Sequence, residues 1–146
     1  DDGRLRPAPG TPNRADYLFW FHVSQGSLQP LLTNKFVMMA MTARAPFFLK
    51  PAAKMLVGGL DKAFFGPRLK ALMTEIEKAL GKSTWFAGDN LTAADIVMGY
   101  SMELAAHRAG MDAGNYPNAH RFLQQMRAYP SYQRALEKDG KGTILL

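Results

Sequence analysis

The side chains that could do acid–base or metal chemistry are few and lie far apart in the sequence. The chain has 146 residues with three histidines and no cysteine, which excludes a disulfide framework and a thiolate metal site. The histidines, His22, His107 and His120, are too widely spaced to suggest a ligand cluster, and no H-E-x-x-H motif occurs. No G-x-S-x-G or phosphate-binding glycine loop is present either. We therefore expect no metal and no catalytic residue in this segment.

The glutamate side chains also give little indication of catalytic chemistry. Glu75 and Glu77 stand two apart on an expected helix, so they face different directions and cannot form an acid–base pair. Glu103 is the one acid in the interior of an apolar helix. We expect it to be paired in the core, with Arg108 or Arg127; the alternative is that it reaches a ligand pocket.

A helix entrance explains Asp95 better than catalysis does. Thr92 is a good N-cap, and Asp95 three residues later can accept a hydrogen bond from the Thr92 N–H. Leu91 before the cap and Ile96 after it have the spacing of a hydrophobic staple. The helix that follows, from Ala93 to about position 109, is apolar or small on every side. Such a helix lies in the middle of a domain.

The rest of the chain predicts helices and no strand. The first helix is expected to be capped by Thr11, with Pro12 at its first position, to bend near Pro30 and to end near position 43. The pattern then predicts helices over 50–64, 66–81, 117–129 and 131–138. The expected apolar faces are Leu69, Leu72, Met73, Ile76 and Leu80 in the second of these, Phe122, Leu123, Met126 and Tyr129 in the third, and Tyr132, Ala135 and Leu136 in the last. The fold class is therefore all-α.

Three segments carry a resemblance to a known family. Residues 85–96 (WFAGDNLTAADI), 17–30 (YLFWFHVSQGSLQP) and 129–136 (YPSYQRAL) resemble the C-terminal all-helical domain of cytosolic glutathione S-transferases of bacterial and fungal type. The resemblance implies an orthogonal helical bundle around the helix that starts near Ala93. Residues 1–10 are rich in proline, glycine and charge and are expected to be an interdomain linker, with the helical domain over 11–146. The resemblance also implies a preceding thioredoxin-like domain, missing here, with the thiol-activating residue.

The first helix has one face that suggests a partner or ligand. Helical spacing places Tyr17, Trp20, Ser24, Ser27, Leu28 and Leu31 on one side, and His22, Gly26, Gln29 and Thr33 on the other. The second set is polar but uncharged, which fits a partly buried wall. By resemblance, His22 and Gly26 would touch glutathione bound in the neighbouring subunit, although the simpler interpretation of His22 is an ordinary interface histidine. Gln29, Phe36, Tyr100 and Leu104 would line the electrophile pocket, and packing explains Tyr100 and Leu104 equally well.

The positive charge is concentrated in the first half of the chain. The net charge is +6, and the residues from Ala71 onward are balanced, so the whole excess precedes them. A basic rim would attract an anionic ligand such as glutathione, and the alternative is an ordinary cationic surface without a ligand. No recognition motif supports nucleic acid binding. Residues 38–65 combine this charge with many methionines and phenylalanines. They could pack on the bundle, form a lid over an apolar pocket or touch a membrane surface, and the last is the least expected.

The function implied by the resemblance is conjugation of glutathione, the co-substrate, to a small apolar electrophile by a cytoplasmic homodimer. Domains of this type also serve as non-catalytic assembly modules, which is the alternative. The sequence that precedes Asp1 would separate the two, because an enzyme requires a thioredoxin-like domain there.

Overall fold

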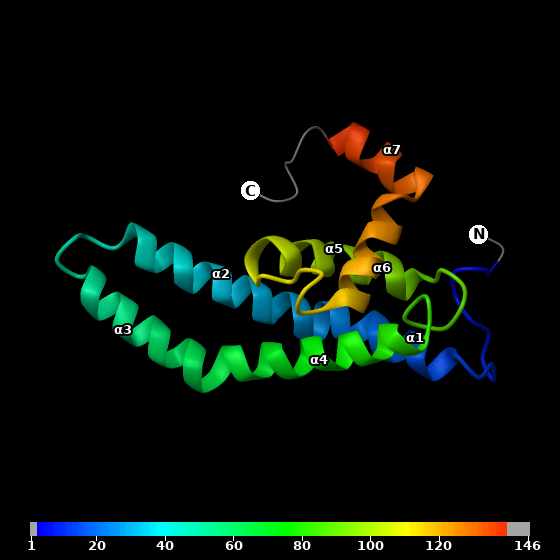
Figure 1. Cartoon of the computed structure of the whole chain (residues 1–146), viewed down its shortest axis with the longest axis horizontal. Coiled ribbons are helices and arrows are strands. Elements are labelled where there is room, and N and C mark those ends of the chain that lie inside the picture. Colours follow the sequence, from blue (N-terminus) through cyan, green and yellow to red (C-terminus); the bar gives the residue numbers. More distant parts are fainter. Residues whose placement is uncertain (1–2, 140–146) are drawn as a thin grey trace.

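The computed structural model describes residues 3–139, and in this range it contains helices and no strand (Figure 1). The helices are α1 (Arg14–Val23), α2 (Gln29–Arg44), α3 (Lys50–Leu60), α4 (Gly66–Lys82), α5 (Ala93–Arg108), α6 (Pro117–Arg127) and α7 (Pro130–Asp139). Two π-helical turns, η1 (Ser24–Leu28) and η2 (Asp61–Phe65), join α1 to α2 and α3 to α4 without a break. The expected all-α bundle is confirmed.

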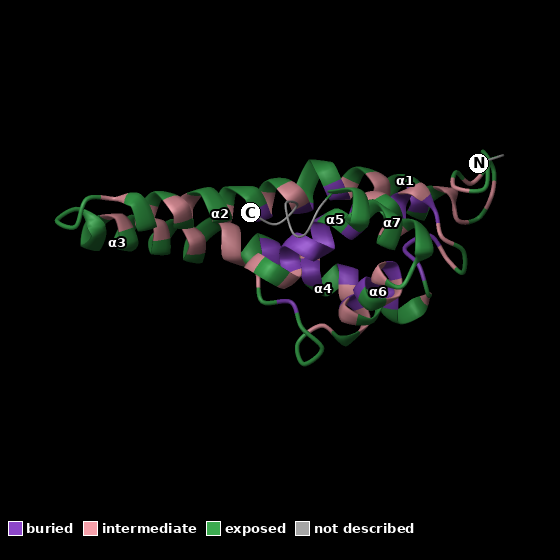
Figure 2. Cartoon of the chain, turned by 90° about the horizontal axis from the view of Figure 1, so that it is seen from above, coloured by how far each residue is buried: buried purple, intermediate pink, exposed green. Residues whose placement is uncertain are grey.

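Helix α5 is the centre of the bundle, as its composition predicted. It contacts α1, η1, α2 and α6, and most of its residues from Ala94 to Ala105 are buried (Figure 2). Gly99 faces Met126 of α6, and a Cβ atom there would lie 3.1 Å from the methyl carbon of that side chain. An aromatic cluster of Trp20, Phe86, Phe122 and Trp85 closes one end of the core.

The turn η1 changes the register of the first helical rod. A π-helical turn holds one residue more than an α-helical turn, here closed by the Gln29 N–H donating to the Ser24 carbonyl. The buried stripe is consequently Tyr17, Trp20, Ser24, Leu28 and Leu32. Ser27 and Leu31 would share this side in an uninterrupted α-helix, but in the structure Ser27 is exposed and Leu31 is only half-buried. Pro30, the second residue after the turn, has no N–H to donate to the α-helical pattern, and the irregularity expected near it is this π turn.

Two features of the helix boundaries differ from those expected. Helix α1 starts at Arg14 after the N-cap residue Asn13, without a side-chain cap, and the Thr11 hydroxyl donates instead to the Ala8 carbonyl (2.8 Å). Gly66 does not open a separate helix but continues the rod from α3 through η2 into α4. Its lack of a side chain matters, since a Cβ atom would lie 2.9 Å from the Asp61 carbonyl oxygen. Near Pro46 the chain turns as expected, between α2 and α3.

The C-terminal half of α2 and all of α3 project beyond the other helices as a two-helix arm (Figures 1 and 2). We call residues 36–65 the arm. Packing of this region against the bundle was the leading expectation, and the structure contradicts it for most of its apolar residues. Only a few side chains, such as Met38 and Val57, are half-buried between the two helices. The exposed apolar residues are Phe36, Val37, Met39, Met41, Phe47, Phe48, Leu49, Met55, Leu56, Leu60 and Phe64.

At the other end of the chain, α6 has the predicted buried face of Phe122, Leu123 and Met126, with Ala119 added. Tyr129 was expected on this face but lies just past the helix and is exposed. Helix α7 forms where predicted but has no buried residue. Ala135 and Leu136 are exposed, contrary to expectation, because α7 contacts α6 and extends away from the bundle (Figure 1).

Candidate functional site

The entrance of α5 is built around the carboxylate of Asp95, which is fully buried. One of its oxygens accepts hydrogen bonds from the N–H (2.7 Å) and the hydroxyl (2.8 Å) of Thr92. The other accepts the N–H of Phe86 at 2.8 Å. Burial raises the pKa of Asp95, although these hydrogen bonds act in the opposite direction. All of its partners belong to the loop and cap, so Asp95 is a structural residue, as the sequence indicated.

The capping box is confirmed, and a further hydrogen bond adds to it. The N–H of Ala93 donates to the carbonyl of Leu5 at 2.8 Å, which ties the N-terminal segment to the start of the helix. The expected staple is less clear in the structure. Leu91 is half-buried, whereas 47% of Ile96 is exposed.

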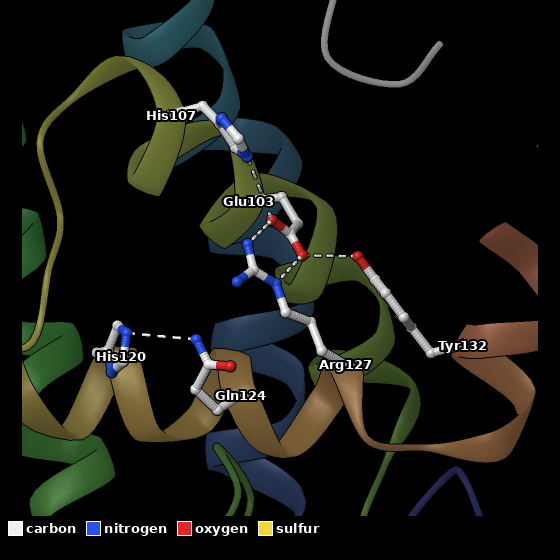
Figure 3. A network of polar contacts seen from close by, with 6 residues as sticks. All are labelled: Glu103, His107, His120, Gln124, Arg127 and Tyr132. Atoms are coloured by element: carbon white, nitrogen blue, oxygen red, sulfur yellow. Dashed lines mark hydrogen bonds and ion pairs between the residues drawn. The ribbon is translucent and has the colours of Figure 1, made fainter. Parts of the chain in front are cut away.

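A second polar network joins α5, α6 and α7 (Figure 3). The carboxylate of Glu103 is buried and accepts two hydrogen bonds from the Arg127 guanidinium, at 2.8 and 2.6 Å. The Tyr132 hydroxyl donates to the same carboxylate at 2.7 Å, and His107 Nε2 lies 4.0 Å from it. The expected pairing of Glu103 with Arg127 is therefore correct. Tyr132 was expected only to pack, and sequence reasoning missed its polar role because it lies 29 residues away.

The network shifts the pKa values of its members in the directions expected for an ion pair. Burial alone would raise the pKa of Glu103, but the hydrogen bonds from Arg127 and Tyr132 and the charge of Arg127 outweigh it and lower that pKa. The pKa of Tyr132 is raised by burial and by its hydrogen bond to the carboxylate. Glu103 is thus held as an ion, and Tyr132 as a neutral donor. Both residues join helices together, which makes the network structural.

The residues predicted to touch ligands lie along α1, η1, α2 and α5. His22 and Gly26 are exposed, so both are accessible to a partner. Tyr100 is 40% exposed and Phe36 is 39% exposed. Leu104 is buried in the core, where it packs against the bundle. The Arg108 guanidinium lies over the Phe36 ring, 3.9 Å from its centre, and so brings a positive charge to the side of this surface.

Gln29 is the most distinctive of the predicted residues. It directly follows the π turn and is half-buried, and its side-chain oxygen is buried without a hydrogen-bond partner in the described part of the chain. On the buried side of the same turn, the Ser24 hydroxyl contacts α5 through the Val97 carbonyl (2.8 Å) and the Ser101 hydroxyl (3.1 Å). These contacts fix the turn against α5. Turns of this kind are frequent at functional sites.

The arm contains a groove that sequence reasoning did not anticipate. It has a volume of about 490 Å³ and runs along the seam between α2 and α3. Its base holds an ion pair between Lys35 and Asp61 (3.1 Å). Its walls are mainly apolar, with Lys50 and Lys54 also lining it. Only the antiparallel packing of the two helices creates it, so no pattern along one helix could have indicated it.

The described residues supply no evident centre for covalent or metal chemistry. Between residues 3 and 139, no group of three or more His, Asp or Glu side chains is placed to hold a metal ion. No helix in that range is long and apolar enough to span a bilayer. The arrangement provides exposed and half-buried wall residues, which suits binding against another domain or subunit.

Comparison with known proteins identifies the fold and the family. The family model described as "Glutathione S-transferase, C-terminal domain" matches residues 40–139. The chain is 26% identical over 130 residues to Glutathione S-transferase 3 of Schizosaccharomyces pombe, covering 89% of this chain and 53% of the relative. It is 26% identical over 124 residues to Glutathione S-transferase 1 of Saccharomyces cerevisiae, covering 84% of this chain and 52% of the relative. The chain thus spans about half the length of these curated relatives.

Solved structures agree on the fold. A glutathione S-transferase from Actinobacillus pleuropneumoniae superposes with a TM-score of 0.63 at 22% identity, covering 98% of this chain and 59% of that one. A glutathione S-transferase from Pseudomonas fluorescens gives a TM-score of 0.63 at 20% identity, covering 87% of this chain and 57% of that one. The family match covers more than half of the chain, and the helical bundle and its buried capped helix agree with it. This chain belongs to the glutathione S-transferase C-terminal domain family.

Proposed function

We propose that this chain is the helical half of a cytoplasmic glutathione transferase, which joins the glutathione thiolate to a small apolar electrophile. The observation that carries the proposal is the family match over residues 40–139 together with relatives that are themselves named glutathione S-transferases. Residues 1–10 would connect the helical domain, over 11–146, to a thioredoxin-like domain, and that domain would supply the thiol-activating residue. The whole protein would act as a homodimer.

Within this proposal, residues in and around the π turn serve ligand binding, together with Phe36 on α2 and Tyr100 on α5. His22 and Gly26 would meet glutathione held in the partner subunit, since both are accessible. Gln29, Phe36 and Tyr100 would form the wall of the electrophile pocket. Gln29 is half-buried, so the accessible part of its side chain can contact a ligand. Leu104 would support this wall from the core, given its burial.

The isolated chain should fold but should not conjugate glutathione. It has a continuous core, and the α5 entrance is capped by residues of the chain itself. We expect a helical circular dichroism spectrum and cooperative unfolding, with no turnover of a model aryl halide. The full-length protein, assayed in parallel, should be retained on immobilised glutathione and turn the aryl halide over. Turnover by the isolated chain would show that the thiol-activating residue lies within this chain and not in a thioredoxin-like domain. No retention and no turnover by the full-length protein would instead favour a non-catalytic assembly module.

Replacement of His22 by alanine in the full-length enzyme should raise KM for glutathione about three- to tenfold, which corresponds to the loss of one hydrogen bond. The KM for the electrophile should change little. Gln25→Ala is a matched control, because Gln25 is also exposed and lies in the same turn of the rod. Equal increases in KM for glutathione in the two variants, or a change confined to KM for the electrophile, would argue against contact between His22 and glutathione.

A further inference from the structure

The arm ends in a loop of exposed apolar residues that nothing in the described structure covers. Phe47 is 85% exposed and Phe48 66%, and Leu49 beside them is also exposed. On the adjoining helices, Met41, Met55 and Leu56 are 65%, 71% and 69% exposed. Scattered apolar residues are normal on a protein surface, but a contiguous group of this kind marks an interaction site.

The same region carries positive charge. Between Phe36 and Phe65 the sequence has four basic residues, Arg44, Lys50, Lys54 and Lys62, and a single acid, Asp61. That acid is already paired with Lys35 at the base of the arm. Arg44 and Lys50 flank the apolar loop on its two sides, and Lys54 lies one helical turn further along α3. All three are exposed.

The shape of the arm favours a soft, extended surface as its partner. The arm projects beyond the rest of the molecule, so its tip can approach a flat surface first, with the bundle held away from it (Figures 1 and 2). A convex tip of phenylalanine and leucine can enter the boundary between lipid headgroups and acyl chains without a complementary pocket. Methionine side chains adapt to such irregular apolar surroundings.

The positive charge of the arm favours a lipid bilayer over a second copy of the chain as its partner. Two arms packed on each other would bring Arg44, Lys50 and Lys54 together with the same residues of the partner, with no free acid in the arm to balance them. Negatively charged lipid headgroups would complement these side chains. We propose that the tip of the arm is a peripheral docking site for anionic membrane surfaces, with Phe47, Phe48 and Leu49 inserted among the lipids and Arg44, Lys50 and Lys54 on the headgroups. The site does not depend on the proposed transferase activity.

Vesicle co-sedimentation tests the proposal. The chain should bind phosphatidylcholine vesicles that contain phosphatidylserine, should bind pure phosphatidylcholine vesicles far less, and should be released by raised salt. Each basic residue near an anionic surface contributes about a fivefold gain in partitioning, so replacing Arg44, Lys50 and Lys54 with glutamine should reduce binding about a hundredfold. The double variant Phe47→Ser and Phe48→Ser should also lose most of the binding. Because these side chains are exposed, the variants should unfold at the same temperature as the parent chain.

Two control variants match these changes away from the arm. Ile96→Ser removes an exposed apolar side chain from α5, and replacing Lys82, Arg134 and Lys138 with glutamine removes the same number of exposed charges. Both controls should bind as the parent chain does. Absence of binding to anionic vesicles, or equal binding by the tip variants, would overturn the proposal. So would a dimer, seen by light scattering, that the Phe47→Ser and Phe48→Ser variant converts to a monomer, because the tip would then be a protein interface.

Discussion

Replacing Asp95 with alanine should lower the free energy of unfolding by about 3–5 kcal/mol. The substitution removes the acceptor for the Phe86 N–H, the Thr92 N–H and the Thr92 hydroxyl, all in a buried environment. Each buried donor left without a partner costs about 1–3 kcal/mol, and the lost cap adds to this. Since a domain of this size is stable by only about 5–15 kcal/mol, this loss is a large part of the total stability. Urea unfolding followed by circular dichroism measures the effect.

Asp89→Ala is the matched control for this result. Asp89 lies in the same loop but is exposed, so its replacement should change stability by less than about 0.5 kcal/mol. Thr92→Ala should give an intermediate loss of about 1–2 kcal/mol, because the Asp95 carboxylate and the Phe86 N–H remain together. If Asp95→Ala unfolds at nearly the same urea concentration as the parent chain, the carboxylate does not organise the entrance of α5.

Replacing Arg127 with methionine should cost about 3 kcal/mol of stability. The change leaves the buried carboxylate of Glu103 with one hydrogen-bond donor, the Tyr132 hydroxyl. The imidazole of His107 lies 4.0 Å from the carboxylate. Breaking a buried ion pair by removing one member costs about 3–5 kcal/mol, and the lower end applies because the Arg127 side chain is 35% exposed. Arg134→Met, on the exposed α7, should have almost no effect. The double variant Glu103→Gln and Arg127→Met should recover part of the loss, since no buried charge remains.

The pH dependence gives an independent test of the same pair. The pKa of Glu103 is lower in the folded protein than its ordinary value of 4.5, so the folded state binds this proton less readily than the unfolded chain does. The stabilisation by the carboxylate is therefore complete above the ordinary value and is lost as the pH falls through the lowered pKa. The difference in stability between the parent chain and Glu103→Gln should be largest near neutral pH and shrink in acid. A difference that is constant with pH would show that the carboxylate charge is not the source of the stabilisation.

Features that depend on residues close together in the chain could be predicted from the amino-acid sequence. The pairing of Thr92 with Asp95 spans one helical turn, so residue type and spacing are sufficient to predict it. The burial of α5 followed from its uniformly apolar composition, and the buried face of α4 from its helical period. The all-α class and the family resemblance rest on such local patterns, and both were confirmed.

Features that depend on contacts between distant segments could be seen only in the folded chain. The Phe86 N–H completes the Asp95 site from outside the helix, and Tyr132 reaches Glu103 from α7. The π turn at Ser24–Leu28 buries Leu32 in place of Leu31, because one added residue rotates everything that follows it. Whether an apolar side chain is covered depends on what packs beside it, and composition does not state this. Residues 38–65 could therefore be identified as apolar and basic from their sequence, whereas only the packing of α2 on α3 placed them on a projecting arm.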